Sequence, residues 1–343
     1  MIEYCIVFLL SLIFVKLIKR KKIEVKDAFM IIVLVLFAGL RNGIGTDYNM
    51  YKAFYFNPSL QSAEKVEEGF ITLINVSNMI FNDKYYLFFI VCSIISIVPV
   101  YSLFKKNSRY PGLSLLLFIS LGFYTLTFNM VRQFIAMAIV FCSISFIQKK
   151  QFFRYLACII IAALFHTTAL IMIPIYFWSN FNFTKKQIRQ IFLILLFAGV
   201  VFNPIFNFVT SHIPQYSMYA NYGGVTPGIG TYLINFIYIF IILFVIFNYE
   251  KMIKNETEKI CLNFGILSVA FIILSLKNIL FARLIYYFFI PLLIPFANIF
   301  DFFNYQKSQK VFNVILVVLL FIIYILNIIS FNGVYPYVSI WSV

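Results

Sequence analysis

Long apolar runs recur along almost the whole chain, and most of them are roughly 16 to 20 residues long. A helix needs about 20 apolar residues to cross the hydrocarbon core of a bilayer. Only 11% of the 343 residues are charged, whereas about 25% are charged in an ordinary soluble domain. The runs are continuous rather than alternating, which excludes an outer-membrane barrel. The sequence therefore predicts an all-α, polytopic integral membrane protein and excludes a soluble enzyme.

Clusters of Lys and Arg separate these runs and set the expected topology. They are Lys19–Lys22 with Lys26; Lys105, Lys106 and Arg109; Lys149, Lys150 and Arg154; Lys185, Lys186 and Arg189; Lys251, Lys254 and Lys259; and Lys307 with Lys310. Basic loops stay in the cytoplasm, so each stretch between two clusters is predicted to be a hairpin that crosses out and back. About twelve crossings result, and both termini are placed outside. The expected crossings are 2–18, 27–41, 85–104, 111–129, 132–148, 151–166, 167–180, 189–208, 230–248, 260–277, 283–300 and 311–330.

The net charge of +15 is explained by this topology, because 20 of the 27 Lys and Arg residues fall on the cytoplasmic side. Nucleic acid is therefore not an expected partner. All five cysteines lie inside apolar runs, which indicates packing residues rather than disulfides or a metal site. The first apolar run precedes its basic cluster, which is the wrong order for a cleavable signal peptide.

The chain is predicted to form a single transmembrane domain over 1–343, with two longer outer stretches. In 42–84, the side chains of Glu68, Thr72, Asn75 and Asn78 fall on one helical face, which predicts a short amphipathic helix at the outer interface. The second stretch, 209–229, is rich in Tyr, Gly and Pro.

Four cations and one histidine are predicted to stop at the same depth, just beneath the outer interface. At 1.5 Å per residue, they lie about 21 to 27 Å from the cytoplasmic ends of their helices, within a core about 30 Å thick. They are Arg41, Arg132, His166, Lys277 and Arg283. Such a set suits a lipid-linked pyrophosphate, because Arg binds phosphate oxygens bidentately. The alternative is that each cation only reaches up to the lipid headgroups.

Several residues near this level favour chemistry on a sugar. His166 and Asp47 are candidate proton acceptors, although a hairpin histidine and a helix-capping aspartate would need no such role. Glu68 has the same two interpretations. Gln133 adjoins Arg132 and is a further candidate ligand of the pyrophosphate. Tyr48 and other tyrosines of the outer stretches would suit stacking on sugar faces, or would form an ordinary aromatic belt.

Five segments, taken in order, resemble the EpsG family, which comprises Wzy-type polymerases of exopolysaccharide, capsule and O-antigen. The resemblance rests on Arg41–Tyr48, Glu68–Phe70, Asn129–Ala136, Phe165–Leu170 and, less specifically, Arg283–Tyr287. It is most specific over 35–180.

The resemblance implies a GT-C-like membrane glycosyltransferase in the cytoplasmic membrane. Such an enzyme moves a growing glycan from undecaprenyl pyrophosphate to a new lipid-linked repeat unit on the outer face, without a metal or other cofactor. A flippase and a chain-length regulator are the protein partners that this implies. The matched polar positions are Arg41, Asp47, Arg132, Gln133 and His166, followed by Arg283. Tyr286 and Tyr287 join Glu68 and Tyr48 as candidate sugar-binding residues.

Two other functions fit parts of the sequence. An O-antigen-ligase-like transferase would use the same lipid-linked donor, but such ligases usually have a much larger outer domain than any loop in this chain. A flippase or transporter would need cations along a path open to both leaflets, whereas the predicted midplane is almost free of charge. The polymerase is the hypothesis that the sequence favours.

Overall fold

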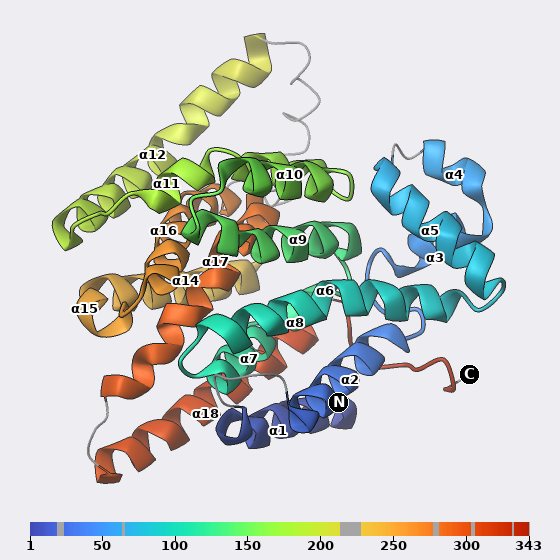
Figure 1. The fold of residues 1–343 in the computed structure, drawn as a ribbon, viewed down its shortest axis with the longest axis horizontal. Coiled ribbons are helices and arrows are strands. Elements are labelled where there is room, and N and C mark those ends of the chain that lie inside the picture. The colour runs from blue at the N-terminus through green and yellow to red at the C-terminus, as the bar shows by residue number, and fades with distance from the viewer. Residues whose placement is uncertain are drawn as a thin grey trace. The chain divides into compact units, whose positions relative to one another are not determined.

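The computed structural model describes residues 1–18, 24–63, 66–212, 228–276, 281–302, 306–330 and 333–342. Every element named within these ranges is a helix (Figure 1). The chain divides into two compact units. Unit 1 comprises Met1–Tyr176 and Ala297–Val343, and unit 2 comprises Phe177–Phe296.

Unit 1 is built around the long helix α6 (Tyr85–Asn107). Its other helices are α1 (Ile2–Leu17), α2 (Val25–Gly39), α3 (Tyr48–Phe56), α4 (Pro58–Ala63), α5 (Glu68–Phe81), α7 (Pro111–Ser120), α8 (Phe123–Leu126), α9 (Val131–Gln148), α10 (Phe152–Ala163), the 3₁₀ helices η1 (Thr167–Met172) and η5 (Ala297–Phe302), and α18 (Gln306–Ser330). Helices α2, α5 and α9 pack against α6, and α10 packs against α9. Helices α1 and α18 pack against α7.

Unit 2 has α16 (Glu256–Ser275) at its centre. Helices α12 (Lys185–His212), α14 (Ile229–Phe247) and α17 (Ala282–Phe296) contact α16, and the short helix α15 (Tyr249–Met252) follows α14. Helix α11 (Ile175–Asn180) lies where the chain passes from unit 1 to unit 2.

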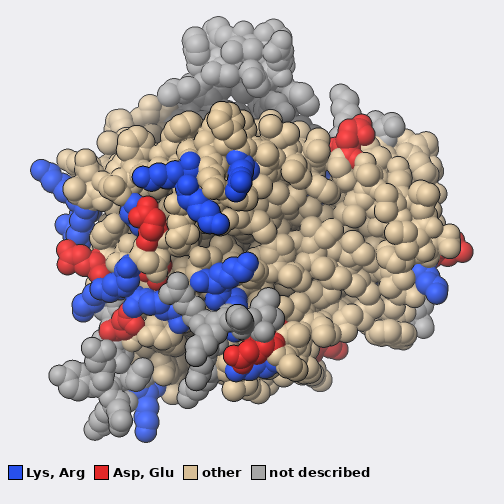
Figure 2. All heavy atoms as spheres, in the orientation of Figure 1, with Lys and Arg blue, Asp and Glu red and all other residues tan. Residues whose placement is uncertain are grey.

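Six described helices are long and apolar enough to cross a membrane. They are Tyr85–Asn107, Val131–Gln148, Gly230–Phe247, Glu256–Ser275, Ala282–Asp301 and Lys310–Ile329. Figure 2 shows wide areas of the molecular surface without any Lys, Arg, Asp or Glu. Together these features identify an all-helical, multi-pass membrane protein. The figure of about twelve crossings stays a prediction, because three apolar helices, Ile2–Val15, Pro111–Ser120 and Phe152–Ala163, are shorter.

Four expected crossings are not single uninterrupted α-helices, and local chemistry explains two of the breaks. The 111–129 segment stops at Ser120 and resumes as α8, because Gly122 adopts a left-handed conformation with φ of 85°. In 167–180, a 3₁₀ helix and a turn precede α11, and Pro174 lacks the amide that a continuous helix would use. The 151–166 segment is α-helical only to Ala163, and 283–300 continues past Phe296 as 3₁₀ helix.

Helix α5 covers the segment predicted to be amphipathic. Its buried face, with Phe70, Ile74 and Ser77, lies toward a core that also contains Phe88 and Phe89 of α6. The opposite face, with Glu68, Thr72 and Asn75, is exposed. This packing fixes the N-terminal end of α5, where the candidate site begins. The other expected outer stretch, 209–229, lies mostly outside the described residues.

The C-terminal tail pairs with the loop that follows α2. Ser339 forms an antiparallel bridge with Arg41, the Asn42 amide donates to the Val338 carbonyl (2.8 Å), and the Ile340 amide donates to the Leu40 carbonyl (3.0 Å). The Tyr4 hydroxyl of α1 donates to the carbonyl of Val334 in the same tail (2.5 Å). The start of α1, the end of α2 and the tail therefore meet at one place in unit 1.

Candidate functional site

Five polar side chains of unit 1 form a continuous network. They come from four separate places in the chain: Asp47 and Tyr51 at the start of α3, Glu67 immediately before α5, Arg132 in the first turn of α9, and His166 in the turn after α10. Three of the five, Asp47, Arg132 and His166, are sequence-predicted site residues, and the structure brings them together.

Glu67 is the hub of this network. Its Oε2 accepts a hydrogen bond from Nη1 of Arg132 at 2.5 Å. Its Oε1 lies 2.8 Å from Nδ1 of His166 and also accepts from the backbone amide of Thr167 at 3.3 Å. One carboxylate thus holds a guanidinium and an imidazole at once, and both bonds are charge-assisted because the accepting carboxylate is ionised.

Tyr51 extends the network to Asp47. The Tyr51 hydroxyl accepts from Nε of Arg132 and donates to Oδ2 of Asp47, both at 3.4 Å. Asp47 Oδ1 accepts from the Thr46 hydroxyl at 3.0 Å. The two Tyr51 bonds are at the long end of the hydrogen-bond range, so this link is weaker than the one through Glu67.

Neither acidic residue caps the helix that it precedes. Asp47 and Glu67 occupy the N-cap positions of α3 and α5, yet neither side chain bonds to its own helix amides. The capping role that the sequence allowed for Asp47 is therefore wrong. The Gly69 amide donates to the Leu164 carbonyl at 2.8 Å and holds the start of α5 against the turn that bears His166.

The network is partly open. The side chains of Glu67, His166 and Arg132 are 11%, 17% and 23% exposed. Partial burial alone would raise the pKa of Glu67, but the hydrogen bond from His166 and the charge of Arg132 lower it to about 2. Glu67 is therefore ionised at neutral pH. Arg132 keeps N–H groups without partners among the described residues, and these are available to an anion.

Arg41 lies apart from this network and is 1% exposed. Its Nε donates to the Ile44 carbonyl (3.2 Å), its Nη2 to the Phe128 carbonyl (3.0 Å), and its Nη1 to the Ala38 carbonyl. The rings of Tyr48, Phe89 and Phe128 surround the guanidinium at 5.0 to 5.5 Å. It forms no ion pair with Asp47, because its guanidinium nitrogens donate to backbone carbonyls instead.

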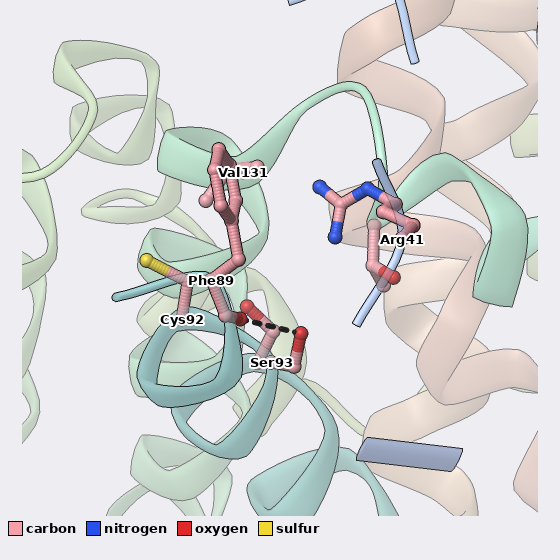
Figure 3. Close-up of a pocket in the computed structure, with 7 residues that line it drawn as sticks. Arg41, Phe89, Cys92, Ser93 and Val131 are labelled. Atoms are coloured by element: carbon pink, nitrogen blue, oxygen red, sulfur yellow. Dashed lines mark hydrogen bonds between the residues drawn. The ribbon is translucent and has the colours of Figure 1, made fainter. Parts of the chain in front are cut away.

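A small pocket lies beside Arg41 (Figure 3). The guanidinium faces Phe89, Cys92, Ser93 and Val131 there, and the pocket has no room for a water molecule. A pyrophosphate does not fit there. In this conformation the predicted role of Arg41 as a pyrophosphate ligand is not available, and the side chain instead joins the end of α2 to the segment before α9.

Several other predicted site residues are placed away from the network. Gln133 is 2% exposed and Tyr48 is fully buried with its ring stacked on Phe89 at 4.4 Å, so neither reaches a sugar or a phosphate here. Glu68 is exposed, but its carboxylate has no partner among the described residues, because the turn of α5 directs it away from Arg132 and His166.

The last of the five family-like segments, Arg283–Tyr287, belongs to unit 2. Arg283 is exposed at the start of α17, Tyr286 is half-buried and Tyr287 is fully buried, which removes the Tyr287 ring from direct contact with a sugar. Lys277 lies outside the described residues.

Sequence reasoning missed Glu67, and it offered Tyr51 only as one of the outer tyrosines suited to stacking on a sugar. Helical periodicity favoured Glu68 over Glu67 because Glu68 lies on the polar face of α5. Glu67 precedes the helix, and no periodic pattern reports where a residue outside a helix points. No cluster of three or more His, Cys, Asp or Glu side chains able to hold a metal occurs in the described part of the chain.

The comparisons with known proteins gave one match. The family model described as EpsG family matches residues 24–339, which contain every segment of the network. No curated protein and no solved structure matches the chain significantly.

Proposed function

The chain belongs to the EpsG family, and on this premise we propose that it is a Wzy-type polymerase of lipid-linked oligosaccharide repeat units. Family membership points to a role in polysaccharide biosynthesis, and the apolar helices place that role in a membrane. The proposed reaction transfers the growing glycan from undecaprenyl pyrophosphate to a new undecaprenyl-pyrophosphate-linked repeat unit. It needs no metal in this proposal.

The observation that supports a glycosyl transfer is the pairing of a candidate base with a cation in one partly open network. His166 or Asp47 would take the proton of the acceptor hydroxyl, a step typically worth about 10² to 10⁴ in rate. The N–H groups of Arg132 that have no partner among the described residues would stabilise the charge that develops on the departing pyrophosphate. His166 and Arg132 contact the same carboxylate, Glu67, and so are held at a fixed separation.

Further residues stay candidates for contacts with the substrate, without being placed in the network. Arg283 and Lys277 are candidate cations for the pyrophosphate, and Tyr286 is a candidate for stacking on a sugar. Glu68 is exposed one residue from Glu67 and is suited to hydrogen-bond a sugar hydroxyl. Arg41 is left out of this set, since it is buried and each of its three guanidinium nitrogens donates to a backbone carbonyl.

The proposed setting is the outer face of the cytoplasmic membrane, in a GT-C-like arrangement of about twelve crossings. A flippase and a chain-length regulator would act beside it. The test is cysteine labelling on a background without the five native cysteines. Ser342→Cys should react with an impermeant thiol reagent in spheroplasts, and Lys310→Cys should react only after the membrane is opened. Labelling of Lys310→Cys in closed spheroplasts would contradict this topology.

The function itself is tested with purified protein and defined undecaprenyl-pyrophosphate-linked repeat units. The wild type should build a ladder of products, whereas His166→Gln should bind the repeat units without extending them. If His166→Gln extends them normally and Asp47→Asn does not, the base is Asp47. Products attached to a different acceptor would indicate a ligase. Normal ladders from both variants would mean that the network is not the active site.

A further inference from the structure

Glu67 is an acidic residue at a helix N-cap that bonds to other side chains instead of its own helix. We infer that Glu67 is a positioning residue that fixes His166 in the form whose Nε2 accepts the proton of the acceptor hydroxyl. The inference rests on the proposed function and goes beyond it, because it chooses His166 over Asp47 and assigns a role to a residue that no sequence pattern selected.

Contact with Glu67 sets the tautomer of His166. An ionised carboxylate only accepts hydrogen bonds, so the ring nitrogen 2.8 Å from Glu67 Oε1, which is Nδ1, must carry a proton. A neutral imidazole then has its lone pair on Nε2. Nε2 has no hydrogen-bond partner among the described residues, and the side chain is 17% exposed, so a substrate hydroxyl can approach it.

Two donors hold the Glu67 carboxylate in place. Arg132 Nη1 binds Oε2 at 2.5 Å, and the Thr167 amide binds Oε1 beside the imidazole. These two donors fix both oxygens of the carboxylate, one from α9 and one from the turn that bears His166. The low pKa of Glu67 agrees with this, since the carboxylate stays ionised across the working range of a histidine base.

The two candidate bases, Asp47 and His166, differ in the groups that orient them. Asp47 is bonded to the hydroxyls of Thr46 and Tyr51, and no carboxylate or amide orients it. His166 has an orienting group on one nitrogen and an open position on the other, the arrangement that a general base needs. The charged groups near His166 are Glu67 by direct contact and Arg132 through the shared carboxylate, whereas the exposed Glu68 is directed away.

The proposed reaction forms one bond and breaks one. The acceptor hydroxyl oxygen forms a bond to the anomeric carbon, and the bond from that carbon to the pyrophosphate oxygen breaks. The electron pair of the broken bond leaves with the pyrophosphate, and the hydroxyl proton moves to Nε2 of His166. The imidazolium that results is stabilised by the ionised Glu67 at Nδ1.

The test uses Glu67→Gln, which keeps the shape of the side chain and removes its charge. Arg132 donates a short, charged hydrogen bond at the Oε2 position, which outweighs the longer, neutral bond from the Thr167 amide at Oε1. The glutamine would therefore place its carbonyl oxygen against Arg132 and its NH₂ group against His166. Nδ1 would then have to accept, and the proton would move to Nε2. The expected result is a fall in kcat of about 100-fold or more with little change in KM. Glu67→Asp keeps the charge and should retain more turnover, and Asp83→Asn, which removes an exposed outer carboxylate, is the matched control.

A second readout does not depend on activity. The chain has only two histidines, so ¹⁵N-histidine labelling of a His212→Gln background reports His166 alone by NMR. The wild type should show a protonated Nδ1 and a bare Nε2, and Glu67→Gln should show the reverse. A wild type with the proton on Nε2, or full turnover by Glu67→Gln, would overturn the inference. If the wild type fails to extend lipid-linked repeats, the proposed function is wrong, and the NMR spectra still decide whether Glu67 sets the tautomer.

Discussion

Two arginines from the family-matched segments lie in unit 1, in very different surroundings. Arg41 is enclosed by aromatic rings and bonds only to backbone carbonyls, whereas Arg132 is partly open and bonds to a carboxylate and a tyrosine. A cation whose three nitrogens each donate to a backbone carbonyl has a structural task. A cation that shares a carboxylate with a histidine, and whose Nη2 has no partner among the described residues, is suited to bind a substrate. The comparison shows that depth and residue type alone do not distinguish the two tasks.

The largest effect is expected from Arg41→Lys. A lysine keeps the charge but has no planar fork, so it cannot reach carbonyls of Ala38, Ile44 and Phe128 together. Loss of two charged hydrogen bonds in a buried site costs about 3 kcal/mol or more. The yield of folded, monodisperse protein should fall sharply, and the melting temperature in detergent should drop. Arg154→Lys, an exposed arginine bonded to Gln151, is the control. A stable but inactive Arg41→Lys would instead make Arg41 a ligand of the substrate.

The same substitution at Arg132 should have the opposite signature. Arg132→Lys can keep the ion pair with Glu67, so the melting temperature should change little. The lysine lacks the Nε donor that reaches Tyr51 and the Nη2 donors that are available to an anion. Turnover should therefore fall about 100-fold, which is the range found when one donor to a transition state is removed. The measurements are product ladders from defined lipid-linked repeats and the melting temperature of the same samples. Equal turnover with the wild type would assign Arg132 to topology or structure.

Much of this arrangement follows from the sequence, and the part that does not has an identifiable reason. Periodicity and apolar length locate the helices, since both are local properties; α5 and the long helices α6, α9 and α16 lie where they were expected. Hydropathy does not report breaks such as Gly122, because a left-handed residue leaves the apolar run intact. It also does not report the tail that pairs with Leu40–Asn42, since that contact joins chain ends about 300 residues apart.

The candidate site was predictable in its members and less so in their connections. Arg132 and His166 are predicted because they interrupt apolar sequence at one level, and Asp47 because it follows Arg41 in a turn with two glycines. All three lie in one network. The burial of Arg41 and Tyr48 depends on long-range packing against Phe89 and Phe128, which no local pattern contains. Glu67 and Glu68 are adjacent and chemically identical, so only the direction of each side chain separates them.

A pair of glycines in the Arg41 loop offers a finer test of how tightly that region is built. Gly45 has φ of 99°, and a Cβ there would lie 2.7 Å from the Phe128 carbonyl oxygen. Gly43 has φ of 66° and open space around the same position. Gly45→Ala should therefore lower the stability by about 2 kcal/mol, and Gly43→Ala by about 1 kcal/mol or less. Equal melting temperatures for the two variants would show that the loop can move away from Phe128 at little cost.

The smallest effect is expected at Tyr51, the link between Arg132 and Asp47. Tyr51→Phe removes only the hydroxyl, and the ring stays in the core with Phe70 at 5.1 Å. Both lost bonds are 3.4 Å long, so each contributes little, and Arg132 keeps its short bond to Glu67. Turnover should fall by a few-fold, about 1 kcal/mol in the barrier, with no change in melting temperature. The loss should disappear in an Asp47→Asn background if Tyr51 acts only by connecting Asp47 to Arg132, because the two changes then remove the same interaction. A 100-fold loss in Tyr51→Phe would place Asp47 and Tyr51, rather than Glu67 and His166, at the centre of the chemistry.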